Sequence, residues 1–147
     1  MRYAFLALLV VALAACDSVG DDPGSYGGVV EVSLAEIPER GLALRLVAVE
    51  DQDGCGDLLR TELARDGATR TVSVLGIQRP PPGAVVCDAI IPASATVALD
   101  LGPELPGGYA VRVEHAGRTD LYELDLTTPE PTLAAVRTSR TRLAEPR

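Results

Sequence analysis

The residues best suited to binding a hard cation form an acidic turn at positions 50–57, EDQDGCGD. Calcium takes about six to eight oxygen ligands, and closely spaced carboxylates in a glycine-bearing turn can supply several of them. The ligands would be Asp51, Asp53 and Asp57. The EF-hand pattern is incomplete, because Val49 stands where an acid is needed. A solvated turn without an ion is therefore the alternative to a calcium site.

Side chains for other kinds of chemistry are scarce. His115 is the only histidine, and no GxSxG nucleophile motif accompanies it. Because His115 precedes the Ala116-Gly117 turn, we expect its side chain to be exposed at a strand end. Zinc and copper sites of the usual kind need more His, Cys or Met. We therefore expect a protein that is not an enzyme, although a carboxylate pair assembled only by folding stays open.

Two of the three cysteines, Cys55 and Cys87, suggest a disulfide, since an exported chain with an even pair of thiols usually joins them. The bond would close a loop of about thirty residues and contribute roughly 3 to 4 kcal/mol. A reactive or metal-binding thiol pair is the rival interpretation. The chain has no CxxC spacing to support it.

The third cysteine ends an apolar N-terminal segment. Residues 4–15, AFLALLVVALAA, follow Met1-Arg2-Tyr3 and have the length of a signal-peptide core, too short for a comfortable membrane span. The segment closes on Leu13-Ala14-Ala15-Cys16, which resembles the lipobox of bacterial lipoproteins. An ordinary secretory signal or a buried strand is the alternative.

The resemblance implies that residues 1–15 are removed and that Cys16 carries lipid on its thiol and its new amine. Several acyl chains make membrane residence stable, so Cys16 would anchor the protein in the bacterial cell envelope. The following residue, Asp17, does not decide between the inner and outer membranes. Residues 16–28 comprise the lipidated cysteine and the polar sequence DSVGDDPGSYGG, which predicts a flexible tether.

Charge limits the partners of this protein. The net charge is −8, and every basic residue is arginine. An acidic surface repels phosphate backbones, so we expect no nucleic acid as a partner. The expected partners are the membrane, through the N-terminal lipid, and another envelope protein.

Residues 29–138 carry the pattern of an all-β domain. Short apolar or alternating runs are separated by turn residues, which is typical of a sandwich or barrel. Strands are expected at 29–34, 42–49, 59–65, 68–74, 84–91, 95–101, 109–115 and 119–126, with a short edge strand at 132–136. Asp66-Gly67 predicts a hairpin, with a helix over 58–65 as the alternative. Residues 139–147 are expected to form a polar, frayed tail.

One stretch is similar to immunoglobulin-like and fibronectin-like modules. Leu105-Pro106-Gly107-Gly108-Tyr109 matches their L-x-P-G-x-x-Y corner, one residue short, before an alternating strand. The chain lacks the core tryptophan of those modules. The resemblance implies an immunoglobulin-like antiparallel β-sandwich of about seven or eight short strands, in which the hydroxyl of Tyr109 ties back to nearby backbone.

Together these features predict a lipid-anchored envelope protein with a binding or assembly role. The alternative is a sandwich that binds calcium or a small ligand through Asp51, Asp53 and Asp57. No other cofactor is expected.

Overall fold

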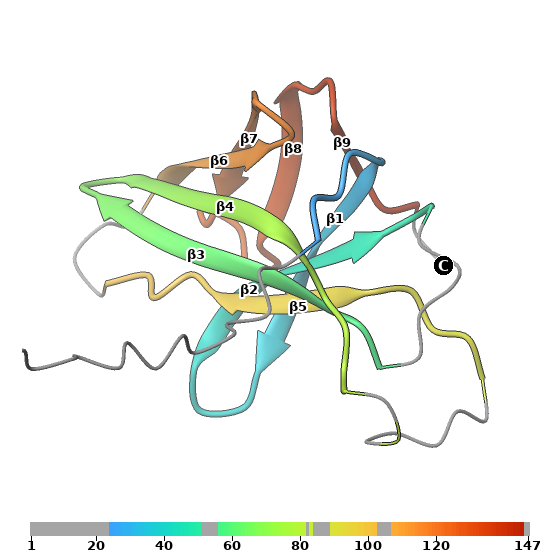
Figure 1. Ribbon diagram of the computed structural model, residues 1–147. Coiled ribbons are helices and arrows are strands. Elements are labelled where there is room, and N and C mark those ends of the chain that lie inside the picture. The colour runs from blue at the N-terminus through green and yellow to red at the C-terminus, as the bar shows by residue number, and fades with distance from the viewer. Residues whose placement is uncertain (1–23, 51–55, 82, 84–88, 103–106, 146–147) are drawn as a thin grey trace, which may run out of the picture.

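The computed structural model describes residues 24–50, 56–81, 83, 89–102 and 107–145. These residues form strands and loops (Figure 1), and none of them belongs to a helix long and apolar enough to cross a membrane. The strands are β1 (Val30–Ile37), β2 (Gly41–Ala48), β3 (Leu58–Asp66), β4 (Thr69–Gln78), β5 (Ser94–Ala98), β6 (Gly108–His115), β7 (Arg118–Asp125), β8 (Thr132–Arg137) and β9 (Thr141–Leu143). The predicted all-β class is confirmed.

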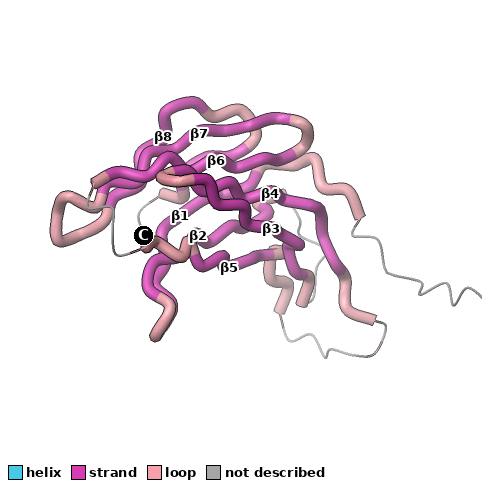
Figure 2. The backbone as a smooth tube through the Cα atoms, turned by 90° about the vertical axis from the view of Figure 1, so that its left-hand side faces the viewer, coloured by secondary structure: helices cyan, strands magenta, loops and turns pink. Residues whose placement is uncertain are grey.

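The strands join in one mixed sheet with the order β8-β7-β6-β4-β3-β5-β2-β1-β9. The pairs β1–β2, β3–β4, β6–β7 and β7–β8 are antiparallel hairpins, and β2 also pairs antiparallel with β5. In contrast, β4 with β6, β3 with β5 and β1 with β9 pair parallel. The sheet curls on itself until it is nearly closed. Figure 2 shows β6, β7 and β8 along one side, with β1, β2 and β5 opposite.

This barrel-like arrangement differs from the expected immunoglobulin-like sandwich. In a sandwich the two sheets are separate layers, packed face to face. Here the β3–β4 hairpin is hydrogen-bonded on both flanks, through β3 to β5 and through β4 to β6. The hairpin therefore joins what would have been two layers into one continuous sheet.

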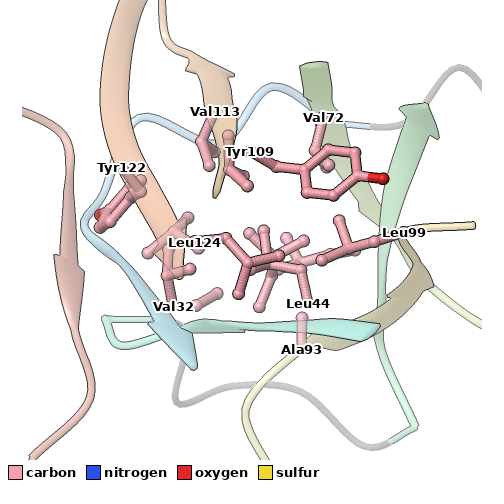
Figure 3. Packing of buried hydrophobic residues seen from close by; sticks show 14 residues of the cluster. Val32, Leu44, Val72, Ala93, Leu99, Tyr109, Val113, Tyr122 and Leu124 are labelled. Carbon is pink, nitrogen blue, oxygen red and sulfur yellow. The ribbon is translucent and has the colours of Figure 1, made fainter. Parts of the chain in front are cut away.

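The core lies inside the curl and is built from alternate residues of most strands. Aliphatic side chains fill it together with two tyrosines, as Figure 3 shows. Fully buried members include Val32, Leu44, Leu46, Val72, Leu99, Tyr109, Val111, Val113, Tyr122 and Leu124. Period-two burial of β-branched and leucine side chains is what fixes these segments as strands.

The two predicted hairpin turns are present. Asp66 ends β3 and pairs with Thr69, so the turn residues are Gly67, with a φ of 52°, and Ala68, one position later than predicted. Ala116 and Gly117 connect β6 to β7 with φ values of 49° and 71°. Positive φ at both Ala116 and Gly117 matches the twist of β6 and β7. The helix considered as the alternative over 58–65 is not formed, because these residues belong to β3.

Three segments differ from expectation. Residues 89–91 are not in a strand, and 84–88 lie outside the described residues. The expected polar tail contains β9, which pairs with β1. Residues 24–28, expected to be flexible, contact the domain: Ile77 N–H donates to Gly24 O at 2.9 Å, and Arg140 Nη1 to Gly27 O at 3.3 Å.

Candidate functional site

Most of the site residues predicted from sequence lie outside the described part of the chain. These are Cys16, Asp51, Asp53, Cys55 and Cys87. Among the described residues, no group of three or more His, Cys, Asp or Glu side chains could hold a metal ion. The calcium site and the disulfide therefore stay predictions.

Asp57, the described member of the acidic turn, is buried just before β3. Its Oδ2 lies 3.5 Å from Nε of Arg79, which follows β4 and is largely exposed. That oxygen accepts no hydrogen bond within the described residues. A buried acceptor without a hydrogen bond is usually costly. The nearby guanidinium already supplies it with positive charge.

The chain segments that lead from the two predicted disulfide cysteines converge at the same end of the sheet. Leu58 at the start of β3 is the parallel partner of Ser94 at the start of β5. Neighbouring strands lie about 4.8 Å apart. Cys55 precedes Leu58 by three positions, and Cys87 precedes Ser94 by seven. Both cysteines are thus close in sequence to two strand starts that are side by side.

His115 is buried, contrary to its expected exposure at a strand end. The cause is the docked N-terminal segment. The Tyr26 ring stacks on the imidazole with centroids 5.5 Å apart, and His115 Nε2 lies 2.8 Å from Gly28 O. A carbonyl oxygen can only accept, so Nε2 carries the proton and donates.

The Tyr26 hydroxyl, at the far end of the ring that stacks on His115, makes two further contacts. It donates to Val29 O at 3.0 Å and accepts from the backbone N–H of Glu50 at 3.2 Å. These contacts tie the segment before β1 to the end of the β6–β7 hairpin and to the chain after β2. Residues 24–28 therefore pack against the strands of the domain.

Asp120, which sequence reasoning did not single out, organises the corner between β8 and β9. Its Oδ1 accepts from Ser139 N at 2.9 Å and Ser139 Oγ at 2.7 Å. Its Oδ2 accepts from Arg140 N at 2.8 Å, Thr141 N at 2.6 Å and Thr141 Oγ1 at 2.7 Å. Since Thr141 has one hydroxyl proton and gives it to Asp120, Tyr122 must donate its own proton to Thr141 Oγ1.

The charge of Asp120 is stabilised by this environment. Burial alone raises the pKa of the carboxyl, but the hydrogen bonds from Ser139, Arg140 and Thr141 outweigh burial and lower the pKa to about 2. Burial also raises the pKa of the Tyr122 hydroxyl, with a further contribution from the nearby Asp120 charge. The signal in the sequence was an aspartate in phase with Tyr122 and Leu124 on the core face of β7.

Arg70 plays the equivalent part at the β3–β4 turn. It is buried and donates from Nε to Leu99 O at 2.8 Å and from Nη1 to Gly67 O at 2.8 Å. Its guanidinium also lies 5.0 Å from the centre of the Tyr109 ring. The Tyr109 hydroxyl is 3.5 Å from Gly102 O, a contact at the length limit of a hydrogen bond. The backbone tie expected for this tyrosine is therefore present but long.

The outer face of β1, β2 and β5 carries a groove of about 780 Å³. Ser33, Arg45, Ser94, Ile91 and Ala144 are among the residues that line it. An ion pair between Arg142 and Glu31, 2.8 Å long, lines it as well. Arg45 is exposed and makes no ion pair or hydrogen bond with another described residue. The groove can thus offer a cation and hydroxyls to a ligand.

The fold and these sites define an all-β domain with a nearly closed mixed sheet and a docked N-terminal segment. No family of sequences, no characterised protein and no solved structure matches the chain significantly.

Proposed function

We propose that this protein is a bacterial lipoprotein of the cell envelope whose β domain binds or assembles with another envelope protein and catalyses no reaction. The observation that carries the proposal is the sequence Leu13-Ala14-Ala15-Cys16 at the end of an apolar, signal-like segment. The lipid on Cys16 would hold the protein at a membrane outside the cytoplasm. The acidic charge supports a protein partner over nucleic acid.

The docked segment supports this arrangement. Residues 24–28 contact β4, β6 and the β8–β9 turn, so the chain enters the domain at a defined place. A fixed entry point restricts which surfaces face away from the anchor. The groove lined by Arg45, Ile91 and Ala144 is one surface on which a partner could bind.

The anchor is tested by replacing Cys16. In the native bacterium, Cys16→Ser is expected to shift the protein from the membrane pellet to the soluble fraction and to prevent incorporation of labelled fatty acid. Ser18→Ala, two positions away, is the matched control and should leave both unchanged. A Cys16→Ser protein that still sediments with membranes would refute the anchor.

The binding role is tested by chemical crosslinking in intact cells, followed by purification and mass spectrometry. A second envelope protein should be recovered reproducibly with the full chain and lost when residues 30–143 are deleted but the signal and Cys16 are kept. Recovery of the same proteins with the anchor alone would contradict a binding role for the domain.

We also propose that Cys55 and Cys87 form a disulfide. Its support is the side-by-side start of β3 and β5, because both cysteines precede these strands. The bond would lie at the same end of the sheet as Asp57.

Calcium binding is the second candidate function, and the buried Oδ2 of Asp57 favours it as an acceptor without a hydrogen bond. Arg79 weighs against it, since a guanidinium 3.5 Å away opposes a second cation. A melting temperature that rises in millimolar Ca²⁺, and not in Asp57→Asn, would support the site. An unchanged melt would exclude it.

A further inference from the structure

One end of the sheet receives the chain from the proposed lipid anchor. Gly24, the first described residue, forms a bridge with Ile77 near the end of β4. Ile77 is in turn the register partner of Leu59 at the start of β3. Since neighbouring strands lie about 4.8 Å apart, Gly24 is within roughly 10 Å of the start of β3. We call the starts of β3 and β5, together with the end of β4, the entry end.

The entry end exposes large apolar side chains. Leu58 at the start of β3 retains 59% of its accessible surface, and Ile90 and Ile91 before β5 retain 69% and 61%. Leu58 is the register partner of Ser94, three positions after Ile91, so the three side chains belong to backbone that lies within about 15 Å. Figure 1 shows the segments before β3 and β5 together at the lower right. A cluster of exposed apolar side chains marks an interaction surface.

The proposed anchor determines what lies next to this end. Cys16 precedes Gly24 by eight positions. An extended chain advances at most about 3.6 Å per residue, so Gly24 is within roughly 30 Å of a membrane that holds Cys16. The β3–β4 turn at the opposite end is farther by the length of β3, about 30 Å for its nine residues. The entry end is therefore the part of the sheet that the anchor holds closest to lipid.

The place where the chain enters is fixed by contacts with two different strands. Ile77 N–H of β4 donates to Gly24 O at 2.9 Å, and the Tyr26 ring stacks on His115 of β6. Because these contacts hold residues 24–28 on the domain, the anchor acts on the entry end and not on another surface.

The chemistry of the entry end suits the boundary between lipid headgroups and acyl chains. Arg79 after β4 is largely exposed and lies beside the buried Asp57. At such a boundary a guanidinium stays among the phosphates while apolar neighbours enter the acyl region. The chain as a whole has a net charge of −8, so anionic lipid repels it. A zwitterionic bilayer is therefore the occupant that these residues fit.

We propose that the entry end rests on the bilayer, with Leu58, Ile90 and Ile91 inserted between the headgroups and the first part of the acyl chains. This deepens the function proposed above and rests on its lipid anchor, which supplies the local concentration that three side chains need. A domain held in this way turns the β1–β2 and β3–β4 turns away from the membrane, toward a protein partner.

The contact is tested with tryptophan, because the natural chain has none and a single introduced one reports its own surroundings. The full chain is purified from native membranes and reconstituted in phosphatidylcholine vesicles that contain lipid brominated on its acyl chains. The emission of Ile91→Trp should shift to shorter wavelength and lose intensity through quenching by bromine. Ala68→Trp, exposed in the β3–β4 turn, is the matched control and should show neither change.

A reporter on β3 tests whether the apolar side chains act together. Leu58→Trp should be quenched as Ile91→Trp is. Adding Ile91→Ser to Leu58→Trp should lower the equilibrium constant for contact by about fivefold or more, because apolar area that enters lipid is lost. Val136→Ser, an exposed apolar residue of β8 on the other side of the barrel, is the control and should leave quenching unchanged. Thermal melts in detergent establish that each variant is folded.

Flotation of the same vesicles separates this proposal from the anchor. A chain that floats with the vesicles while Ile91→Trp is quenched no more than Ala68→Trp would overturn the contact and leave the anchor intact. If the chain does not float, the anchor fails, and a hexahistidine tag in place of residues 1–16, bound to nickel-chelating lipid, holds the domain at the same point. Selective quenching of Ile91→Trp there supports the contact, and equal signals from the two variants overturn it.

Discussion

Asp120 shows how one side chain determines the position of a distant segment. Its carboxylate is buried and accepts hydrogen bonds from Ser139, Arg140 and Thr141. Hydrogen bonds to a charged group contribute about 1.5 to 3 kcal/mol each, and an unsatisfied donor in the core is costly. The stability of the β8–β9 corner therefore depends on the ionised form of this residue.

Asp120→Asn is expected to lower the free energy of unfolding by about 2 to 3 kcal/mol, because an amide nitrogen would face backbone donors. Urea denaturation measures the loss. Asp125→Asn on the same strand is the control, since among the described residues its exposed carboxylate accepts hydrogen bonds from Thr127 alone. Equal losses in the two variants would contradict the role assigned to Asp120.

The pH dependence follows from the same residue. The pKa of Asp120 is lowered from 3.8 to about 2 in the folded protein. Its contribution of about 2 kcal/mol is present above pH 4 and is lost as the pH falls toward 2. In denaturation series from pH 6 to pH 2, Asp120→Asn should lack this part of the acid destabilisation. A parallel decline in both proteins would count against the prediction.

Arg70 is another buried charge, and its partners are backbone carbonyls and the Tyr109 ring. Arg70→Met should destabilise the domain by about 3 kcal/mol, because the carbonyls of Gly67 and Leu99 would lose their donor. The matched control is Arg60→Met on the exposed face of β3, expected to change stability by about 0.5 kcal/mol or less. Thermal and urea unfolding compare the two variants. Similar stabilities would show that solvent replaces Arg70.

Sequence reasoning succeeds at residues whose role is local and fails where the partner is remote. The β3–β4 hairpin was predictable because adjacent residues determine it, although its turn residues are Gly67 and Ala68, one position later than predicted. The burial of His115 was not predictable, because Tyr26 and Gly28 cover it and Gly28 lies 87 positions earlier in the sequence. A lone aspartate in phase with Tyr122 indicated a buried carboxylate, but the strand pattern does not reveal what would bind it.

At the scale of elements, the docked N-terminal segment depends on Gly28. A Cβ placed there would lie 2.5 Å from the Tyr26 hydroxyl and 2.7 Å from Glu50 Oε2, whereas at Gly27 it would meet nothing within 4 Å. Close packing against Tyr26 therefore requires glycine at position 28.

Gly28→Val is expected to displace Tyr26 from His115 and to weaken docking of residues 24–28 by about 1 to 3 kcal/mol. Hydrogen exchange at Ile77 and Glu50, whose N–H groups contact this segment, reports the release. Gly27→Ala serves as the control. Unchanged protection of both amides in Gly28→Val would refute the docking contact.

The strands were largely predictable, but their order in the sheet was not. Alternation and turn residues mark a strand because both act within a few positions. The parallel pairs β4–β6 and β3–β5 arise from contacts between remote segments, which leave no periodic signal. The three-residue β9 was missed because it is short and polar, and its place is set by Asp120 and β1.

At the scale of the whole molecule, the proposed disulfide would connect two segments next to parallel strands. Reduction of the bond, or the double substitution Cys55→Ser and Cys87→Ser, is expected to lower the free energy of unfolding by roughly 3 to 4 kcal/mol. The reason is that the unfolded chain gains conformational entropy when the loop is no longer closed. Thermal melts with and without reductant measure it. The double serine variant should be insensitive to reductant. Identical melts of the natural protein in both conditions would refute the bond.

The pairing of β1 with β9 determines when the domain can be completed. The first and last strands are neighbours, so the sheet lacks one edge until residue 143 is available. A chain that is synthesised or exported from its N-terminus therefore cannot finish folding on the way. Contacts between the two ends of a chain also form slowly. The topology thus keeps the sheet incomplete until β9 is available, so that the two ends of the described region complete the fold together.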